Sequence, residues 1–241
     1  MITLDIETVP KPHMLEWFKK LAPEPWPDNL PPPDGSKVGN RQVHVKDAEA
    51  CQERTQEWLA LQETKRLNAI AKPYAACSLD PNAGDIVAIV TKVSGDTAEV
   101  WTQDPEGPGP FFRSLISVIR NERLFPIVTF NGAEFDLRFI ETHARAAGIA
   151  DEDNIPQAMF RRYSKWPHHD VMQVACGWDK TKRKSQAYLC HCHGIPHDDT
   201  VTGADVFELY RAGEYDKIEA HCKADVESLE KLYYAMKGQT P

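Results

Sequence analysis

Alternating apolar and polar residues open the chain. Residues 2–7 (ITLDIE) place their apolar members on one side and their polar members on the other, which is typical of a half-buried strand. Residues 85–93 and 97–103 are rich in β-forming residues and are separated by SGD, so they predict a hairpin. Residues 123–130 (RLFPIVTF) are almost all apolar, as expected of a strand that is buried on both faces.

Helical periodicity dominates the later part of the chain. Residues 110–122 have an amphipathic pattern, and an Asn-Gly turn at 131–132 precedes a second helix that Gly148 ends. Beyond this helix, Gly194 and Gly213 interrupt a pattern that is mostly helical. The predicted helical segments there are 152–160, 168–177, 185–193, 203–211 and 213–236.

Residues 10–72 interrupt this order of elements. Residues 8–45 are rich in proline, and the three prolines at 31–33 exclude a helix or a central strand there. Residues 46–70 contain strong helix formers, so we expect a long helix as the only regular part. The predicted fold is α/β, a mixed sheet flanked by helices, in which residues 1–241 form one domain. Within it, the Pro-rich and helical insertion follows the first strand.

The charge of the chain is unevenly distributed. The 241 residues carry a formal net charge of -8, so the overall field of the protein does not attract a polyanion. Residues 161–184, however, contain seven Lys or Arg and two Asp, a local net charge of +5. Such a segment beside clustered carboxylates suits chemistry on phosphodiesters, and a solvated loop explains it equally well.

The sequence also indicates a compartment. It contains no run of 18 apolar residues, which excludes a membrane span. The start MITLDIETVP has acidic residues where a secretory signal needs Lys or Arg. Six scattered cysteines favour a reducing compartment over a disulfide framework. We therefore expect a cytoplasmic protein.

Two carboxylates lie in the first predicted strand. Asp5 and Glu7 are two residues apart, so both side chains point to the face opposite the apolar residues. Adjacent carboxylates repel each other unless a cation lies between them, and Mg²⁺ and Mn²⁺ prefer oxygen ligands of this kind. By itself, the pattern is more typical of a polar strand face.

Two further carboxylates lie in predicted helices. Asp136 follows the Asn-Gly turn and sits in the first turn of its helix, where a helix-start aspartate is common. Asp225 adjoins the apolar stripe of the last helix, and His221 lies one turn earlier on the same side. A carboxylate and a histidine at such an edge need partners, which either a structural pair or a site would supply.

Taken together and in order, these motifs have a family likeness. D-x-E in the first strand, N-G-x-x-F-D after a later strand and H-x-x-x-D in the last helix resemble the DEDD superfamily of 3′–5′ exonucleases. These are DnaQ-like enzymes with a ribonuclease H-like fold. The resemblance is to the exonuclease-like proteins related to the proofreading domains of family B polymerases. It covers residues 1–9 and about 84–236, including 168–174 and 203–226, and leaves the insertion out.

This resemblance implies a metal-dependent exonuclease. The enzyme would hydrolyse phosphodiester bonds from the 3′ end of DNA, with an unpaired, single-stranded end in the site. Asp5, Glu7, Asp136 and Asp225 would hold two divalent cations, Mg²⁺ or Mn²⁺, about 3.5–4 Å apart. The resemblance also implies that Glu7 contacts the 3′ hydroxyl of the terminal nucleotide.

One residue departs from the family pattern. The superfamily divides by the residue that orients the attacking water: tyrosine four residues before the last Asp in one branch, histidine five before it in the other. His221 has the spacing of the first branch and the residue type of the second. Histidine titrates near neutral pH, so we predict that His221 is the general base.

Two groups of residues are predicted to contact the substrate. Thr8, Asn131 and Phe135 would line the pocket, with Phe135 as a stacking surface, although a core aromatic explains Phe135 as well. Lys182, Arg183 and Lys184 are candidates for gripping phosphates, with Arg161, Arg162 and Lys165 as secondary ones. Asp170 is expected to be structural.

Several alternatives stay open. A 3′–5′ exoribonuclease on short RNA would use the same chemistry, and no motif reports the space around the 2′ carbon that separates RNA from DNA. A non-catalytic nucleic-acid-binding module is the third reading, although an inactive site has no need to keep four carboxylates. A homo-oligomer or a separate protein partner is also left open. Residues 189–197 offer Cys and His, but their C-x-C spacing suits zinc poorly.

Overall fold

A computed structural model describes residues 1–27, 30–101, 107–198 and 200–240. It divides into two compact units, Met1–Val9 with Ser78–Pro241, and Pro10–Cys77. The second unit begins where the predicted insertion begins and ends five residues after it. That the whole chain acts as one domain stays a prediction.

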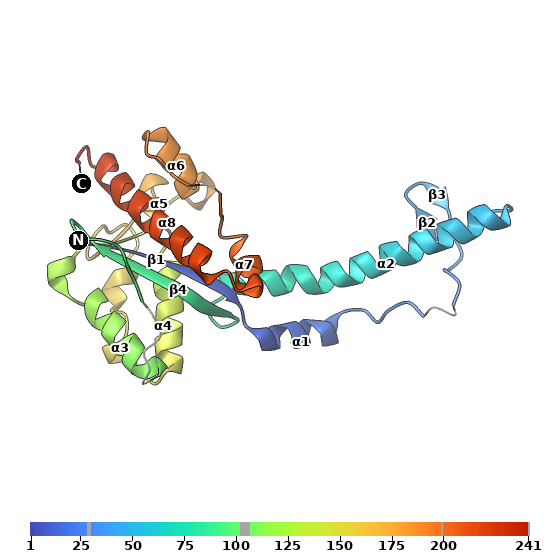
Figure 1. The fold of residues 1–241 in the computed structure, drawn as a ribbon, viewed down its shortest axis with the longest axis horizontal. Coiled ribbons are helices and arrows are strands. Elements are labelled where there is room, and N and C mark those ends of the chain that lie inside the picture. Colours follow the sequence, from blue (N-terminus) through green and yellow to red (C-terminus); the bar gives the residue numbers. More distant parts are fainter. Residues whose placement is uncertain (28–29, 102–106, 199, 241) are drawn as a thin grey trace. The chain divides into compact units, whose positions relative to one another are not determined.

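A five-stranded sheet of order β5-β4-β1-β6-β7 is the centre of the first unit (Figure 1). β6 runs parallel to both β1 and β7, and β4 runs antiparallel to β5. The strands are β1 (Ile2–Pro10), β4 (Gly84–Val93), β5 (Glu99–Val100), β6 (Ile127–Thr129) and β7 (His168–Asp170). Residues 102–103 of the predicted hairpin lie outside the described residues.

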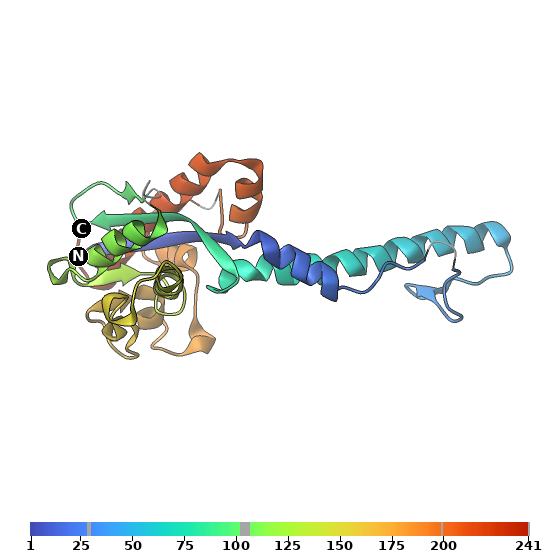
Figure 2. The ribbon, with the colours of Figure 1, turned by 90° about the horizontal axis from the view of Figure 1, so that it is seen from below.

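Helices cover both faces of this sheet (Figures 1 and 2). The even-numbered residues Ile2, Leu4 and Ile6 of β1 pack in one core with α3 (Pro108–Ile119) and α4 (Asp136–Ala146). Val9, on the opposite face, packs with α8 (Tyr215–Met236). The predicted α/β class, with a mixed sheet flanked by helices, is therefore confirmed. Since β1 alternates, its odd-numbered polar residues face α8.

The remaining elements of the first unit are short. They are η1 (Cys77–Leu79), η2 (Glu122–Leu124), η3 (Asp151–Asp153), η4 (Gln157–Phe160), α5 (Val171–Ala175), η5 (Lys180–Lys182), α6 (Gln186–Cys192) and α7 (Val206–Ala212). The helix predicted over 152–160 is wrong, because two separate turns of 3₁₀-helix occupy that region. None of the described helices combines the length and apolar character that crossing a membrane requires.

The helix predicted over 168–177 is also partly wrong, because β7 occupies its first three residues. His168 and His169 are both buried in this strand. The two ring nitrogens of His168 lie 2.7 Å from Thr129 Oγ1 and 2.8 Å from the carbonyl oxygen of Met159. Hydrogen bonds rather than apolar side chains hold β7 in place, so a hydropathy pattern does not report it.

The second unit contains more regular structure than expected. The predicted long helix is present as α2 (Ala48–Ala76), but α1 (Pro12–Leu21) and a small hairpin, β2 (Lys37–Val38) with β3 (Arg41–Gln42), accompany it. The expectation that one helix is the only regular part is therefore wrong. Proline is compatible with the first turn of a helix, where its missing N–H has no intrahelical partner, and Pro12 occupies that position in α1.

Candidate active site

Three elements bring the four predicted carboxylates together. β1 carries Asp5 and Glu7 on its α8 face, α4 begins at Asp136, and α8 carries Asp225. The backbone N–H of Ile6 donates to Asp136 Oδ1 over 3.2 Å, which joins the start of α4 to the middle of β1. Motifs from the first strand, the middle of the chain and the last helix thus meet at one place on the sheet.

His221 lies inside this carboxylate cluster. Its Nε2 is 3.3 Å from Glu7 Oε1 and 3.8 Å from Asp225 Oδ2. Ligand atoms of these three residues all lie within 4.8 Å of one another. The histidine side chain is only 6% exposed, and the one-turn spacing on α8 directs it to the same side as Asp225.

Burial and mutual repulsion perturb the acids of the cluster. Burial raises the pKa of Glu7 to about 8, and the charges of Asp225 and Asp136 add to the effect. Burial likewise raises the pKa of Asp136 to about 8. The pKa of Asp5 lies well above its usual range, first through loss of water around it and then through Asp136, Glu7 and Asp225. The folded protein therefore concentrates acids at a place that disfavours their ionised forms.

The donor set fits divalent cations. Asp136 Oδ2 is buried and accepts no hydrogen bond from a described residue. Burying a carboxylate oxygen without a partner is unfavourable, and so is the repulsion among four neighbouring acids. A hard cation bound between them would remove both penalties. Oxygen ligands of this type suit Mg²⁺ and Mn²⁺. Asp5, Glu7, Asp136 and Asp225 are the residues that could hold such ions.

The turn before α4 owes its shape to Asp170. Asp170 Oδ1 accepts from the backbone N–H groups of Asn131 and Gln173, and Oδ2 accepts from that of Ala133. Asn131 has a φ of 69°, a conformation that asparagine tolerates better than most residues. Gly132 approaches Thr129 so closely that a Cβ would lie 2.2 Å from Thr129 Oγ1. The Asn-Gly pair and Asp170 therefore set the position from which α4 presents Asp136.

The predicted substrate residues Thr8, Asn131 and Phe135 differ in their availability. The Thr8 hydroxyl donates to the carbonyl of Ser78 over 2.6 Å. Asn131 Oδ1 is buried without a hydrogen-bond partner among the described residues. Phe135 packs against the core and lies 4.9 Å from the ring of Phe139. Of the three, Asn131 has the polar group that a ligand would satisfy.

The predicted phosphate-gripping run is partly occupied by contacts within the protein. Arg183 pairs with Glu134 over 2.8 Å. Lys182 pairs with Asp179 over 3.3 Å, and Lys184 Nζ lies 5.4 Å from the ring centroid of Tyr188. Because Glu134 belongs to the turn before α4, Arg183 ties the basic segment to the cluster.

Two residues near the cluster carry no signal in the sequence. Cys222 donates its S–H to Asp5 Oδ2 over 3.3 Å, and His197 Nε2 lies 3.9 Å from Asp225 Oδ1. Cys222 reads as an ordinary apolar position of α8, and His197 lies in an irregular segment, so neither has a periodic pattern to identify it. Among the described residues, Cys190, Cys192 and the histidines of 189–197 form no cluster of three metal ligands.

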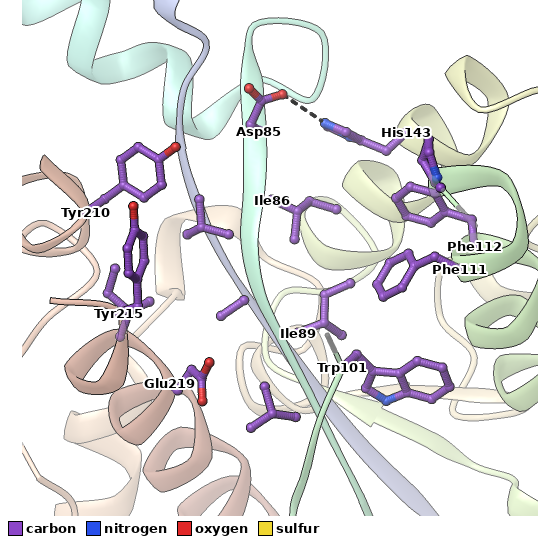
Figure 3. A pocket seen from close by; sticks show the side chains of 16 residues that line it. Asp85, Ile86, Ile89, Trp101, Phe111, Phe112, His143, Tyr210, Tyr215 and Glu219 are labelled. Atoms are coloured by element: carbon purple, nitrogen blue, oxygen red, sulfur yellow. Dashed lines mark ion pairs between the residues drawn. The ribbon is translucent and has the colours of Figure 1, made fainter. Parts of the chain in front are cut away.

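A cavity of about 700 Å³ lies along β4, and none of the four carboxylates lines it. Figure 3 shows Phe111 and Phe112 on one side of the strand and Tyr210 and Tyr215 on the other. The only ion pair drawn there joins His143 to Asp85 over 3.7 Å. Its walls are mostly apolar, and the carboxylate cluster lies outside it.

Known proteins place the chain in a family. A family described as "Predicted 3'-5' exonuclease related to the exonuclease domain of PolB" matches residues 86–237. No curated protein matches the sequence. Among solved structures, a family B DNA polymerase from the hyperthermophilic archaeon Pyrobaculum calidifontis is similar, with 17% identity and a TM-score of 0.48 over 62% of this chain. The match spans 21% of the polymerase's own length. Since the family match covers well over half of the residues, the chain belongs to the predicted 3′–5′ exonucleases related to the exonuclease domain of PolB.

Proposed function

We propose that this protein is a metal-dependent exonuclease that hydrolyses phosphodiester bonds from the 3′ end of DNA, with an unpaired end in the carboxylate cluster. The observation that carries the proposal is the convergence of Asp5, Glu7, Asp136 and Asp225 from three elements. Asp136 Oδ2 is buried there without a hydrogen-bond partner among the described residues. Family membership supports the direction of cleavage.

The carboxylates, His221 and Asn131 have different roles in the proposed reaction. The four carboxylates hold two divalent cations, which supply charge neutralisation at the phosphate and acidity for the attacking water. His221, within 3.3 Å of Glu7 and 3.8 Å of Asp225, accepts the proton of that water. Asn131, whose side-chain oxygen has no partner among the described residues, hydrogen-bonds the terminal nucleotide.

A labelled-strand assay tests the proposal. Single-stranded DNA and RNA, labelled at either end, are incubated with Mn²⁺, Mg²⁺ or chelator, using the wild type, Asp5→Ala and the control Asp216→Ala. Asp216 is an exposed acid at the start of α8, outside the cluster. Metal-dependent shortening of DNA from the 3′ end, lost only in Asp5→Ala, is expected. Faster shortening of RNA would make the protein an exoribonuclease, and no shortening at all would favour a binding module.

The role of His221 has its own test. His221→Ala is expected to lower kcat at neutral pH by about 10²–10⁴-fold, the range typical of a general base. His221→Tyr places a phenol at the spacing of the tyrosine branch and is expected to retain part of the activity. The exposed His193 provides the matched control, His193→Ala. A His221→Ala protein with wild-type kcat and pH profile would remove the assignment.

A further inference from the structure

A second cavity lies on the other side of the turn that precedes α4. It has a volume of about 180 Å³, below the usual size of a drug-binding pocket. Ala133 and Glu134 form one wall, and Asp136 of the carboxylate cluster follows Glu134 by two residues. The charge of Asp170, which lines the cavity, contributes to the raised pKa of Asp136. The turn at residues 131–135 therefore connects the cavity to the carboxylate cluster.

The polar groups that line this cavity differ in whether a described residue hydrogen-bonds them. Asp170 and His168 use their polar atoms in the hydrogen bonds described above, and the Ser164 hydroxyl donates to the carbonyl of Trp166 over 2.7 Å. Gln173, by contrast, is 7% exposed, and its side-chain amide makes no hydrogen bond to a described residue. An amide offers both donors and an acceptor, the combination that reads the edge of a nucleobase.

Aromatic rings lie beside this amide. Trp178 lines the cavity, and its ring centroid is 5.5 Å from that of Tyr163, which is 72% exposed. Both residues have positive φ angles, 60° and 61°, which bulky side chains rarely adopt. Such strain occurs at sites where the position of a side chain matters more than local stability. Exposed aromatic faces are the surfaces on which single-stranded bases stack.

The rim of the cavity is positively charged. Arg161 and Arg162 line it, and neither forms an ion pair with a described residue. Arg162 instead lies over the Tyr163 ring, 5.6 Å from its centroid. Of the two acids that line the cavity, Glu134 pairs with both Lys180 and Arg183 over 2.8 Å, and Asp170 accepts backbone N–H groups. The rim therefore offers uncompensated guanidinium groups to an anion, in contrast to the partly paired run at 182–184.

We infer that this cavity is a nucleobase subsite for the single-stranded substrate, upstream of the nucleotide that is cleaved. One base enters it, hydrogen-bonds the Gln173 amide and stacks on Trp178, while Arg161 and Arg162 bind the flanking phosphates. This inference rests on the proposed function for the polarity of the strand, because it places the 3′ end at the carboxylates.

Binding of an oligonucleotide in chelator tests the subsite without cleavage. The fluorescence anisotropy of 5′-fluorescein-labelled ten-nucleotide oligothymidylate and oligouridylate gives the Kd. Trp178→Ala and the near-isosteric Gln173→Met are expected to raise Kd about tenfold, a loss of about 1.4 kcal/mol that lies within the range for one stacked base. Trp178→Phe, which keeps a ring, is expected to bind almost as the wild type does.

Matched variants separate the subsite from general effects. Tyr215→Ala removes an exposed aromatic of another pair of neighbouring rings, and Arg123→Ala removes an exposed arginine without an ion pair to a described residue. Both are expected to keep the wild-type Kd. Arg161→Ala should also lower the slope of log K against log salt by about 0.7, as loss of one phosphate contact on a single strand does. An unchanged Kd in Trp178→Ala and Gln173→Met, both folded by circular dichroism, would overturn the inference.

A one-nucleotide substrate distinguishes this inference from the proposed function. The p-nitrophenyl ester of thymidine 5′-monophosphate occupies only the carboxylate cluster, so Trp178→Ala should cleave it as the wild type does while its KM for the decamer rises. An equal loss on both substrates would mean that Trp178 acts on the cluster, against the inference. A wild type that cleaves neither substrate but binds the decamer through Trp178 would contradict the proposed function alone.

Discussion

Asp136 and Asp170 are two buried aspartates on opposite sides of the same turn, and their surroundings differ. Asp170 receives three backbone N–H groups, so both of its oxygens are used. Asp136 receives one from Ile6, and its second oxygen has no partner among the described residues. Asp170 is 5% exposed and Asp136 is 1% exposed, so burial alone does not distinguish the two residues.

The two environments favour different roles, a structural one for Asp170 and the binding of a cation for Asp136. Three backbone N–H groups donate to the carboxyl oxygens of Asp170, and these hydrogen bonds fix the turn. Asp136 is held in place by one hydrogen bond but is not satisfied, and burial raises its pKa to about 8. A bound cation stabilises the ionised form of such a carboxylate more than that of a carboxylate whose oxygens are already hydrogen-bonded. The variants below are expected to change activity at Asp136 and stability at Asp170.

The largest effect is expected from Asp136→Asn on hydrolysis. Losing one cation ligand removes several kcal/mol of transition-state stabilisation, and each 1.4 kcal/mol is tenfold in rate, so the rate should fall at least about 10³-fold. The folded structure should persist, because the amide keeps an oxygen for the Ile6 N–H. Single-turnover cleavage of a 5′-labelled strand measures the rate. An Asp136→Asn enzyme within tenfold of the wild type would place the metal site elsewhere.

The next effect concerns stability against pH in metal-free protein. Burial raises the pKa values of Glu7 and Asp136 to about 8, so between about pH 4 and 8 the folded state holds protons that the unfolded chain has released. The free energy of unfolding should therefore fall by several kcal/mol as pH rises through this window, and level off above it. Excess Mn²⁺ should restore stability at pH 8. Urea unfolding in chelator and in Mn²⁺ measures both.

Two variants sharpen this pH experiment. Asp136→Asn removes one titrating acid, so its stability should depend less steeply on pH. Asp170→Asn removes a charge that raises the pKa of Asp136, so the fall in its stability should end at a lower pH than in the wild type. Equal slopes for the wild type and Asp136→Asn would show that Asp136 does not titrate in this range.

A smaller loss is expected from Asp170→Ala. The change leaves three backbone N–H groups without their acceptor, so the free energy of unfolding should fall by about 3 kcal/mol. Asp179→Ala is the control, because Asp179 caps a short turn at the exposed surface, and loss of such a cap costs about 1 kcal/mol. Urea midpoints give both values. If both variants lost the same free energy of unfolding, Asp170 would stabilise its turn no more than an ordinary surface cap does.

The smallest effect is expected from Gly132→Ala. The new Cβ would lie 2.2 Å from Thr129 Oγ1, so the turn has to shift, at a cost of about 1–3 kcal/mol. Because this turn connects Asp170 to Asp136, the variant should lower both stability and the rate of cleavage. Gly203→Ala, with open space around it, should change neither. A stable Gly132→Ala protein with reduced cleavage would locate the strain at Asp136 alone.

The parts that the sequence predicted are those whose signals are local. Alternation in β1 identified Asp5 and Glu7 as neighbours on one face, and the apolar stripe of α8 placed His221 and Asp225 together. Their convergence with Asp136 followed from family resemblance and not from periodicity, because contacts between distant segments leave no local pattern. The observed cluster agrees with that expectation in position, while the roles of its residues stay predictions.

The parts that the sequence did not predict depend on polar contacts. β7 is held by hydrogen bonds of His168, and α1 forms in a segment whose prolines obscured it. Gln173, whose side-chain amide makes no hydrogen bond to a described residue, looks like an ordinary position of a short helix in the sequence. Only the arrangement of neighbours distinguishes such a side chain.

The hydrogen bond from Thr8 to the carbonyl of Ser78 has a consequence for the evolution of the chain. It joins the two ends of the segment Pro10–Cys77 directly after Glu7. Polymer theory gives a closure entropy that grows only with the logarithm of length, about 0.6 kcal/mol for each doubling. Lengthening or shortening this segment therefore changes the stability of the nuclease framework little. The junction is a permissive site at which this segment can be exchanged without redesign of the carboxylate cluster.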